Sequence, residues 1–170
     1  MRILMTIMLV FVLSTVGLVT GCEKAKADKT IRDAQNKAAQ TLGYIKNIAK
    51  ANNDAFVAGD IDSSIHRPVN EGAAKALTAT NAFVAAIKAA KVAVANGADA
   101  AGQVNALKAF FNSNVASTVL DLTSLLVNVP PALKSKIGVW VTGLQLAIST
   151  FNTLFAEMER AVGGNDYGFA

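Results

Sequence analysis

The feature that most constrains the fold is a long apolar pattern near the C-terminus. Apolar residues recur there at steps of three and four: Leu133, Ile137, Trp140, Leu144, Ile148, Phe151, Phe155, Met158 and Val162. On an α-helix this spacing gathers all of them on one face, whereas on a strand it would scatter them over both faces. Residues 131–162 are therefore predicted to form a helix that buries this inner seam, as we call these nine residues, against other helices.

Three earlier segments show the same rhythm. We predict helices over residues 26–53, 71–95, 99–127 and 131–162. Asn70 suits the N-cap of the second helix and Asp99 that of the third, because their side chains accept hydrogen bonds from free N–H groups. Asn96-Gly97 is typical of a helix C-terminus, and Pro131 fits the first turn of the fourth helix.

The connections between these helices are short, so neighbours along the chain are expected to lie antiparallel. Residues 59–70 are rich in Gly, Asp, Ser and Pro and are expected to form the longest loop. The prediction is an all-α chain, with one domain over residues 22–170 that is an antiparallel, up-down-up-down four-helix bundle. Gly138 and Gly143 are candidates for tight helix contacts, and residues 163–170 are expected to be a flexible tail.

Residues 137–156 carry no charge and are long enough to cross a bilayer. A polar stripe nevertheless recurs by threes and fours within them: Thr142, Gln145, Ser149, Asn152 and Thr153. Because a lipid-facing helix would not usually keep such a stripe, we favour an amphipathic bundle helix. The alternative is membrane insertion, with residues 115–127 as a partner segment.

The N-terminus has the layout of a secretory signal. Arg2 supplies a positive start, and residues 3–19 contain no charge. This matches the n-region and h-region of a signal peptide. The alternative, a permanent transmembrane helix, would be at the short end of what spans a bilayer.

The hydrophobic run ends in Val19-Thr20-Gly21-Cys22, and Cys22 is the only cysteine of the chain. This tetrad resembles the lipobox of bacterial lipoproteins. The resemblance covers residues 1–22 and implies cleavage between Gly21 and Cys22, a diacylglycerol on the Cys22 sulfur and an N-acyl lipid on its amino group. Two or three acyl chains give stable membrane anchoring, where one is marginal.

This resemblance implies a bacterial or phage-encoded lipoprotein of the cell envelope. Glu23 is not the Asp that retains enterobacterial lipoproteins in the inner membrane, so the outer membrane is favoured in a host with two membranes. Residues 22–50 carry seven Lys or Arg against three acids, which suits an anionic lipid surface. Nucleic acid is not an expected partner, because the basic residues alternate with acids and no aromatic stacking set lies among them.

Catalytic patterns are scarce. His66 is the single histidine, and Asp60, Asp62 and Ser64 beside it lack the further acids and the glycine of a calcium loop, so we interpret the group as a polar turn. Glu157 and Glu159, two residues apart, point to different faces of a helix. We expect no enzyme activity, no metal and no cofactor beyond the lipid on Cys22.

Aromatic residues at helical spacing are expected to form core. Phe111, Trp140, Phe151 and Phe155 are the candidates for the lining of an apolar ligand cavity, which is the alternative. The favoured function is a lipid-anchored envelope protein that acts through contacts with another envelope protein, in a structural, adhesion or exclusion role. The competing hypotheses are an apolar-ligand or lipid-binding module and a membrane-active protein that inserts residues 115–156.

Overall fold

A computed structural model describes the backbone of residues 2–162 and the side chains of residues 29–162, and every element in this range is helical. α1 spans Arg2–Val57, α2 spans Ser63–Ala95 and α5 spans Pro131–Val162. Between α2 and α5 runs one helical rod made of α3 (Ala100–Phe110), the π-helical segment η1 (Phe111–Ala116), α4 (Ser117–Leu125) and the 3-10 turn η2 (Leu126–Asn128).

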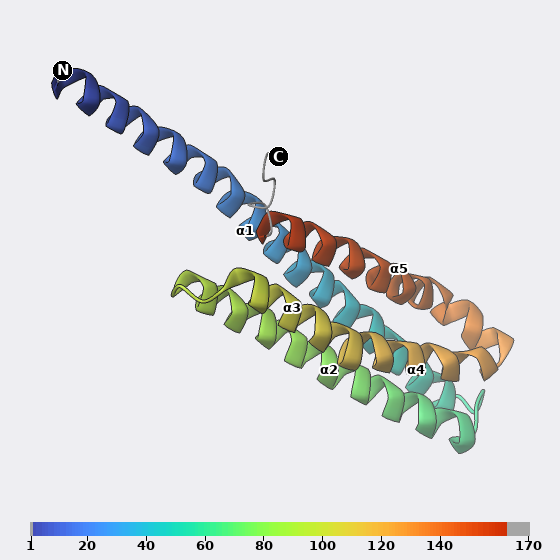
Figure 1. Ribbon diagram of the computed structural model, residues 1–170. Coiled ribbons are helices and arrows are strands. Elements are labelled where there is room, and N and C mark those ends of the chain that lie inside the picture. Colours follow the sequence, from blue (N-terminus) through green and yellow to red (C-terminus); the bar gives the residue numbers. More distant parts are fainter. Residues whose placement is uncertain (1, 163–170) are drawn as a thin grey trace, which may run out of the picture.

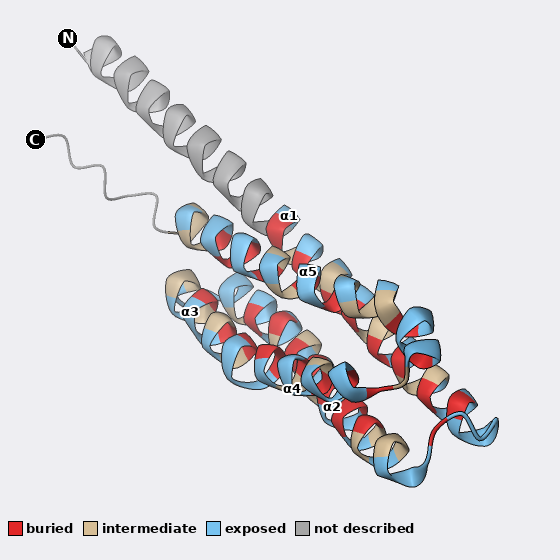
Figure 2. Cartoon of the chain, turned by 90° about the vertical axis from the view of Figure 1, so that its right-hand side faces the viewer, coloured by how far each residue is buried: buried red, intermediate tan, exposed pale blue. Residues whose placement is uncertain are grey.

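The helices lie side by side, and each turns back along the one before it (Figure 1). α1 packs against α2 and α5, while α2 packs against α3, η1 and α4. α3 contacts α5, but α4 contacts α2 instead. Figure 2 shows the buried residues on the inward faces of all these elements. We call the part from residue 29 to residue 162 the helical body.

Two glycines end α1 and α2 in the same way. Gly59 and Gly97 have φ of 78° and 91°, values that favour glycine because it lacks a Cβ. The residue after each glycine donates its N–H to a carbonyl five positions back, Asp60 to Ala55 at 2.9 Å and Ala98 to Ala93 at 3.0 Å. These are Schellman ends. Gly97 was predicted in this role, whereas Gly59 was placed in a loop.

The start of α2 differs from the prediction. The helix expected over residues 71–95 begins at Ser63, and its N-cap is Asp62 rather than Asn70. The Asp62 carboxylate accepts hydrogen bonds from the N–H groups of Ser64 and Ile65. Pro68 lies inside the helix, where it removes one N–H; the carbonyl it leaves free belongs to exposed Ser64 in the first turn and can bond to water. Eight of the twelve residues of the expected loop are therefore helix.

α1 begins at Arg2 and ends at Val57, so it extends well before the predicted range of residues 26–53 and four residues past it. α5 covers residues 131–162 as expected. Asp99 caps α3 through the N–H groups of Ala101 and Gly102, as predicted for the third helix. Within that helix the pattern did not predict η1. Its wider turn coincides with side chains that bond backbone carbonyls, Ser113 to Ala109 and Asn114 to Phe110.

The inner seam of α5 faces the core as predicted. Six of its nine residues are buried: Leu133, Ile137, Leu144, Phe151, Phe155 and Met158. The other three, Trp140, Ile148 and Val162, are half-buried. All five residues of the polar stripe are exposed. α2 and α5 are each long and apolar enough to cross a membrane, but a helix in the core of a soluble protein can have the same length and composition.

The two α5 glycines have different surroundings. A Cβ on Gly143 would lie 2.7 Å from Tyr44 Cε2, so this glycine lets α1 and α5 approach each other closely. A Cβ on Gly138 would meet nothing within 4 Å. The prediction of a tight contact is therefore correct for Gly143 and wrong for Gly138.

Candidate functional sites in the helical body

The expected lipid-attachment residue Cys22 and the cleavage residue Gly21 lie outside the side chains that the structure describes. Their backbone belongs to α1, which continues without a break into the helical body. Residues 163–170, the expected tail, also lie outside the described range.

Five phenylalanines form one cluster in the core. They come from α2, α3, η1 and α5: Phe83, Phe110, Phe111, Phe151 and Phe155. Phe83 is fully buried, and its ring centroid lies 5.4 Å from those of Phe111 and Phe151. Such distances are those of packed aromatic pairs.

Three of the four candidate ligand-lining residues thus meet one another, and Trp140 does not join them. Trp140 lies eleven residues before Phe151 on α5, roughly 16 Å along the helix axis. None of the four lines a pocket described below. The side chains of Phe111, Phe151 and Phe155 are used to fill the core.

An apolar pocket lies elsewhere, where α1 enters the helical body. Side chains from α1, α2, α3 and α5 line it, among them Ile31, Val94, Leu107, Met158 and Val162. Its volume is about 50 Å³. The aromatic pattern did not lead to this pocket, because its lining is aliphatic and comes from the ends of four separate segments.

A wider groove separates the end of the rod from α5. Thr123, Leu126 and Val127 lie on one side, and Ile137 and Val141 lie on the other. The groove has a volume of about 380 Å³. It exists because α4 packs against α2 rather than α5, a choice that no local pattern in either helix encodes.

A polar network joins the end of α1 to the start of α2. Asn52 is 1% exposed, and its Nδ2 donates to the His66 carbonyl at 3.0 Å and to Asn70 Oδ1 at 3.1 Å. Asn53 Oδ1 accepts from Asn70 Nδ2 at 2.8 Å and lies 2.7 Å from His66 Nε2. The Phe56 ring stacks on His66 with centroids 4.1 Å apart.

This network gives the single histidine amide partners instead of carboxylates. Asn53 Oδ1 accepts from Asn70 Nδ2. His66 Nε2 donates to Asn53 Oδ1 in the tautomer that carries a proton there, and accepts from Asn70 Nδ2, 2.9 Å away, in the other. Asn52 Oδ1 is buried with no partner among the described residues. The network's chemistry is that of a polar joint between two helices, and sequence spacing did not reveal it because its members lie up to eighteen positions apart.

Asp62, near His66, accepts hydrogen bonds from the backbone of α2. Hydrogen bonds from the Ser64 hydroxyl and the Ser64 N–H lower the pKa of Asp62.

At the other end of the body Glu159 pairs with Lys108 at 2.6 Å, which ties α5 to α3. Within the described side chains, no three His, Cys, Asp or Glu residues gather in a way that could hold a metal ion.

Comparison with known proteins gives no relative: no family model, no curated protein and no solved structure matches the chain.

Proposed function

We propose that the chain is a lipid-anchored lipoprotein of the bacterial cell envelope whose helical body acts through protein–protein contacts. The observation that carries the proposal is the Val19-Thr20-Gly21-Cys22 tetrad at the end of an uncharged leader. In this proposal residues 1–21 are removed, and Cys22 carries a diacylglycerol and an N-acyl lipid. The absence of Asp after Cys22 favours the outer membrane in a host with two membranes.

The helical body is, in this proposal, an antiparallel up-down-up-down four-helix bundle in which the rod of α3 to η2 counts as one helix. Short connections and the side-by-side packing of successive elements support it. Ile31, in the apolar pocket, follows Cys22 by nine residues of α1, or roughly 13 Å of helix. The end of the body that carries the α2–α3 turn therefore lies nearest the membrane, and the α4–α5 turn lies farthest from it.

Charge on α1 supports this orientation. Lys29 and Arg32 are exposed on the part of the body nearest the proposed anchor. Basic residues within a Debye length of an anionic leaflet are attracted to it, each by about 1 kcal/mol. The groove between α4 and α5, at the far end, is then available to proteins in the envelope.

The test compares the wild-type chain with Cys22→Ser in the native host. Membrane fractionation and mass spectrometry of the mature N-terminus are expected to show a processed, acylated, membrane-bound wild type and an unprocessed Cys22→Ser without lipid. Thr20→Ala is the matched control, because a small residue at that position is compatible with the lipobox, and it is expected to be processed normally. A wild type that carries no lipid would contradict the anchor.

Crosslinking in the same cells, followed by mass spectrometry, tests the contact role. Recovery of one envelope protein in covalent linkage with the wild type, reduced for Cys22→Ser, is the expected result. If crosslinking recovers no particular envelope protein, and the same mixture of proteins in equal amounts for wild type and Cys22→Ser, the contact role is wrong.

The apolar pocket supports a second candidate, a module that binds an apolar molecule. Its volume of about 50 Å³ is well below the ~150 Å³ of an engineered cavity that binds benzene. The pocket therefore admits only a few carbon atoms unless Met158 and Val162 move apart. Native mass spectrometry of the delipidated chain tests this: a co-purifying apolar ligand supports the candidate, and a clean mass of the protein alone contradicts it.

A third candidate, a membrane-active protein that inserts residues 115–156, draws support from the length and hydropathy of α5. Release of dye from liposomes by the non-acylated chain would support it. The exposed polar stripe favours the first proposal, because Gln145 and Asn152 would have to enter lipid.

A further inference from the structure

The outward face of α5 carries a second three-four pattern, opposite the inner seam. Its members are all exposed: Val139, Thr142, Leu146, Ser149, Thr153 and Ala156. Val139 is 69% exposed and Leu146 is 62% exposed. The steps between the six residues are three, four, three, four and three, which is the a/d spacing of a coiled-coil seam. We call these six residues the outer seam; it is about 26 Å long.

The outer seam contrasts with the exposed faces of α1 and α2. Those faces carry Lys46 and Lys50 on α1, and Lys75 and Lys88 on α2. Residues 137–156 of α5 carry no charge at all. Depletion of charged residues is one feature that distinguishes the centre of an interface from ordinary protein surface. The outer seam therefore has the composition of a contact surface.

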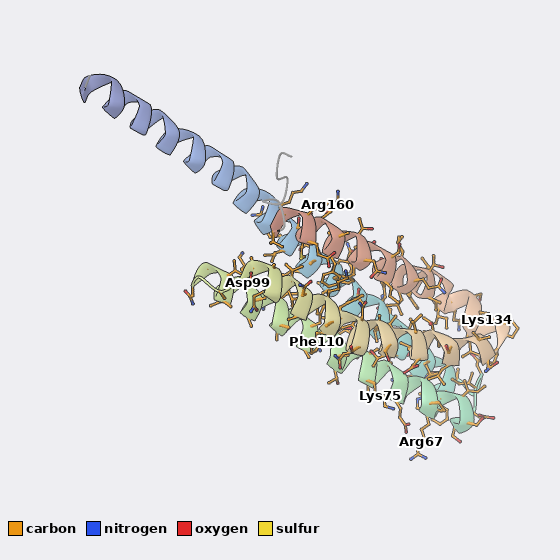
Figure 3. The ribbon with its side chains drawn as sticks, in the orientation of Figure 1. Arg67, Lys75, Asp99, Phe110, Lys134 and Arg160 are labelled. Carbon is orange, nitrogen blue, oxygen red and sulfur yellow. The ribbon has the colours of Figure 1, made fainter. Side chains whose placement is uncertain are left out.

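Charges at the two ends of the outer seam indicate the partner. Lys136 lies just before the seam and Glu157 just after it; both are exposed, and neither forms an ion pair with another described residue. Figure 3 shows Lys134 and Arg160 near these opposite ends of α5. The face thus has a positive end at Lys136, an uncharged middle, and both Glu157 and the exposed Arg160 at its other end.

Such a face is complementary to itself only when one copy is turned end for end. With a two-fold axis between Leu146 and Ser149, Lys136 of one copy comes within reach of Glu157 of the other, and the same pair repeats by symmetry. Arg160 comes opposite Ser135, which has no charge. A parallel pairing would instead place Lys136 beside Lys136 and Glu157 beside Glu157.

We propose that the partner of the outer seam is a second copy of this chain, paired antiparallel through α5. This deepens the contact role proposed above by naming the partner, and it is independent of the lipid on Cys22. The α1 segments then leave the pair at opposite ends. This arrangement suits contact between two facing membrane surfaces better than contact between copies that stand upright in one membrane.

The pair is expected to be weak and reversible. One helix–helix contact about 26 Å long is at the small end of specific interfaces. Thr142, Ser149 and Thr153 contribute little apolar area, while their small side chains let the two helices come close. Dimer should therefore form with increasing protein concentration and be favoured by low ionic strength, which preserves exposed ion pairs.

The first test introduces a charge at the centre of the seam. The full chain, solubilised in mild detergent, is measured by light scattering over a wide range of concentration, with detergent mass subtracted. Leu146→Lys places two like charges near the two-fold axis, and we expect it to remain a monomer where the wild type is a dimer. Val92→Lys on α2 is the matched control, because Val92 is 60% exposed on another helix, and it is expected to dimerise like wild type.

The second test exchanges the end charges. Lys136→Glu and Glu157→Lys each create two like-charge contacts in the antiparallel pair, so each is expected to raise the dissociation constant about fivefold or more. The double variant Lys136→Glu/Glu157→Lys restores opposite charges and is expected to dimerise like wild type. Circular dichroism checks that every variant has wild-type helix content.

Three outcomes would overturn the proposal: a wild type that stays monomeric at every concentration, a Leu146→Lys variant that dimerises like wild type, or a double variant no better than the single ones. Membrane fractionation of the same strains reports the lipid anchor separately. A monomer that is still membrane-bound therefore refutes self-pairing alone, whereas a soluble dimer refutes the anchor alone.

Discussion

The two glycines of α5 allow the contact between α1 and α5 to be measured with a single methyl group. Gly138 and Gly143 both lie in the interior of the helix, where replacing Gly by Ala normally stabilises by about 1 kcal/mol. At Gly138 the new Cβ would meet nothing within 4 Å, so Gly138→Ala is expected to gain about 0.5–1 kcal/mol.

At Gly143 the same methyl would be 2.7, 2.8 and 3.0 Å from three atoms of the Tyr44 ring. The Tyr44 ring is rigid and sits on a packed helix, so it moves away from a new methyl group less easily than the end of a flexible side chain would. Overpacking of this kind costs about 1–3 kcal/mol. Set against the same helix-propensity gain, Gly143→Ala is expected to lose between about 0 and 2 kcal/mol. The two variants should therefore differ by about 1–3 kcal/mol, although the chemical change is identical.

Urea unfolding of residues 23–170, followed by circular dichroism, measures both free energies. The Tyr44→Ala background supplies the decisive control, because without the ring Gly143→Ala should stabilise as Gly138→Ala does. The coupling free energy between positions 44 and 143 is then about 1–3 kcal/mol. If Gly143→Ala and Gly138→Ala stabilise equally in the wild-type background, the Tyr44 ring moves aside freely and the reasoning is wrong.

Three further predictions concern the polar joint, the helix cap and the aromatic cluster. Asn52→Ala removes the donor to Asn70 Oδ1 from a buried site and is expected to lower the free energy of unfolding by roughly 1–3 kcal/mol; Asn53→Ala, at an exposed position, should lose less in the same urea assay. Because hydrogen bonds lower the pKa of Asp62 in the folded protein, its contribution to stability is present at neutral pH and is lost as the pH falls through that lowered pKa. Asp62→Asn keeps a capping side chain, so its urea midpoint should fall less on acidification than that of wild type, and equal acid sensitivity would contradict the assignment. Phe83→Ala is expected to lose about 3–5 kcal/mol, because Phe83 is fully buried and meets four other rings, while Phe56→Ala, at a position 41% exposed, should lose less in thermal unfolding.

Local signals carried most of the helix prediction. Asp99 and Gly97 act within a few residues of their own position, through a side-chain cap and a left-handed backbone, so the sequence alone reveals them. The start of α2 was misplaced because two local signals compete. Pro68 and the polar residues around it suggest a loop, but Asp62, six residues before Pro68, caps the free N–H groups, and the helix begins there.

The candidate sites were predictable only where the signal is local. The tetrad that ends at Cys22 is a continuous motif, so the expectation of a lipid anchor rests on sequence and stays a prediction. The aromatic residues were correctly assigned to the core in the case of Phe111, Phe151 and Phe155. Trp140, eleven residues before Phe151 on the same helix, is half-buried and lies outside their cluster.

The sequence by itself determined that this chain is helical, where the turns after α2 and before α5 fall, and which face of α5 is buried, because periodicity and capping act over one or two helical turns. Only the tertiary structure decided that Tyr44 lies on Gly143, that Asn52 meets Asn70 and that α4 leaves a groove beside α5. Each of these depends on which helices are neighbours and how they are rotated. That choice is made by the packing of all the side chains together, and no single segment records it.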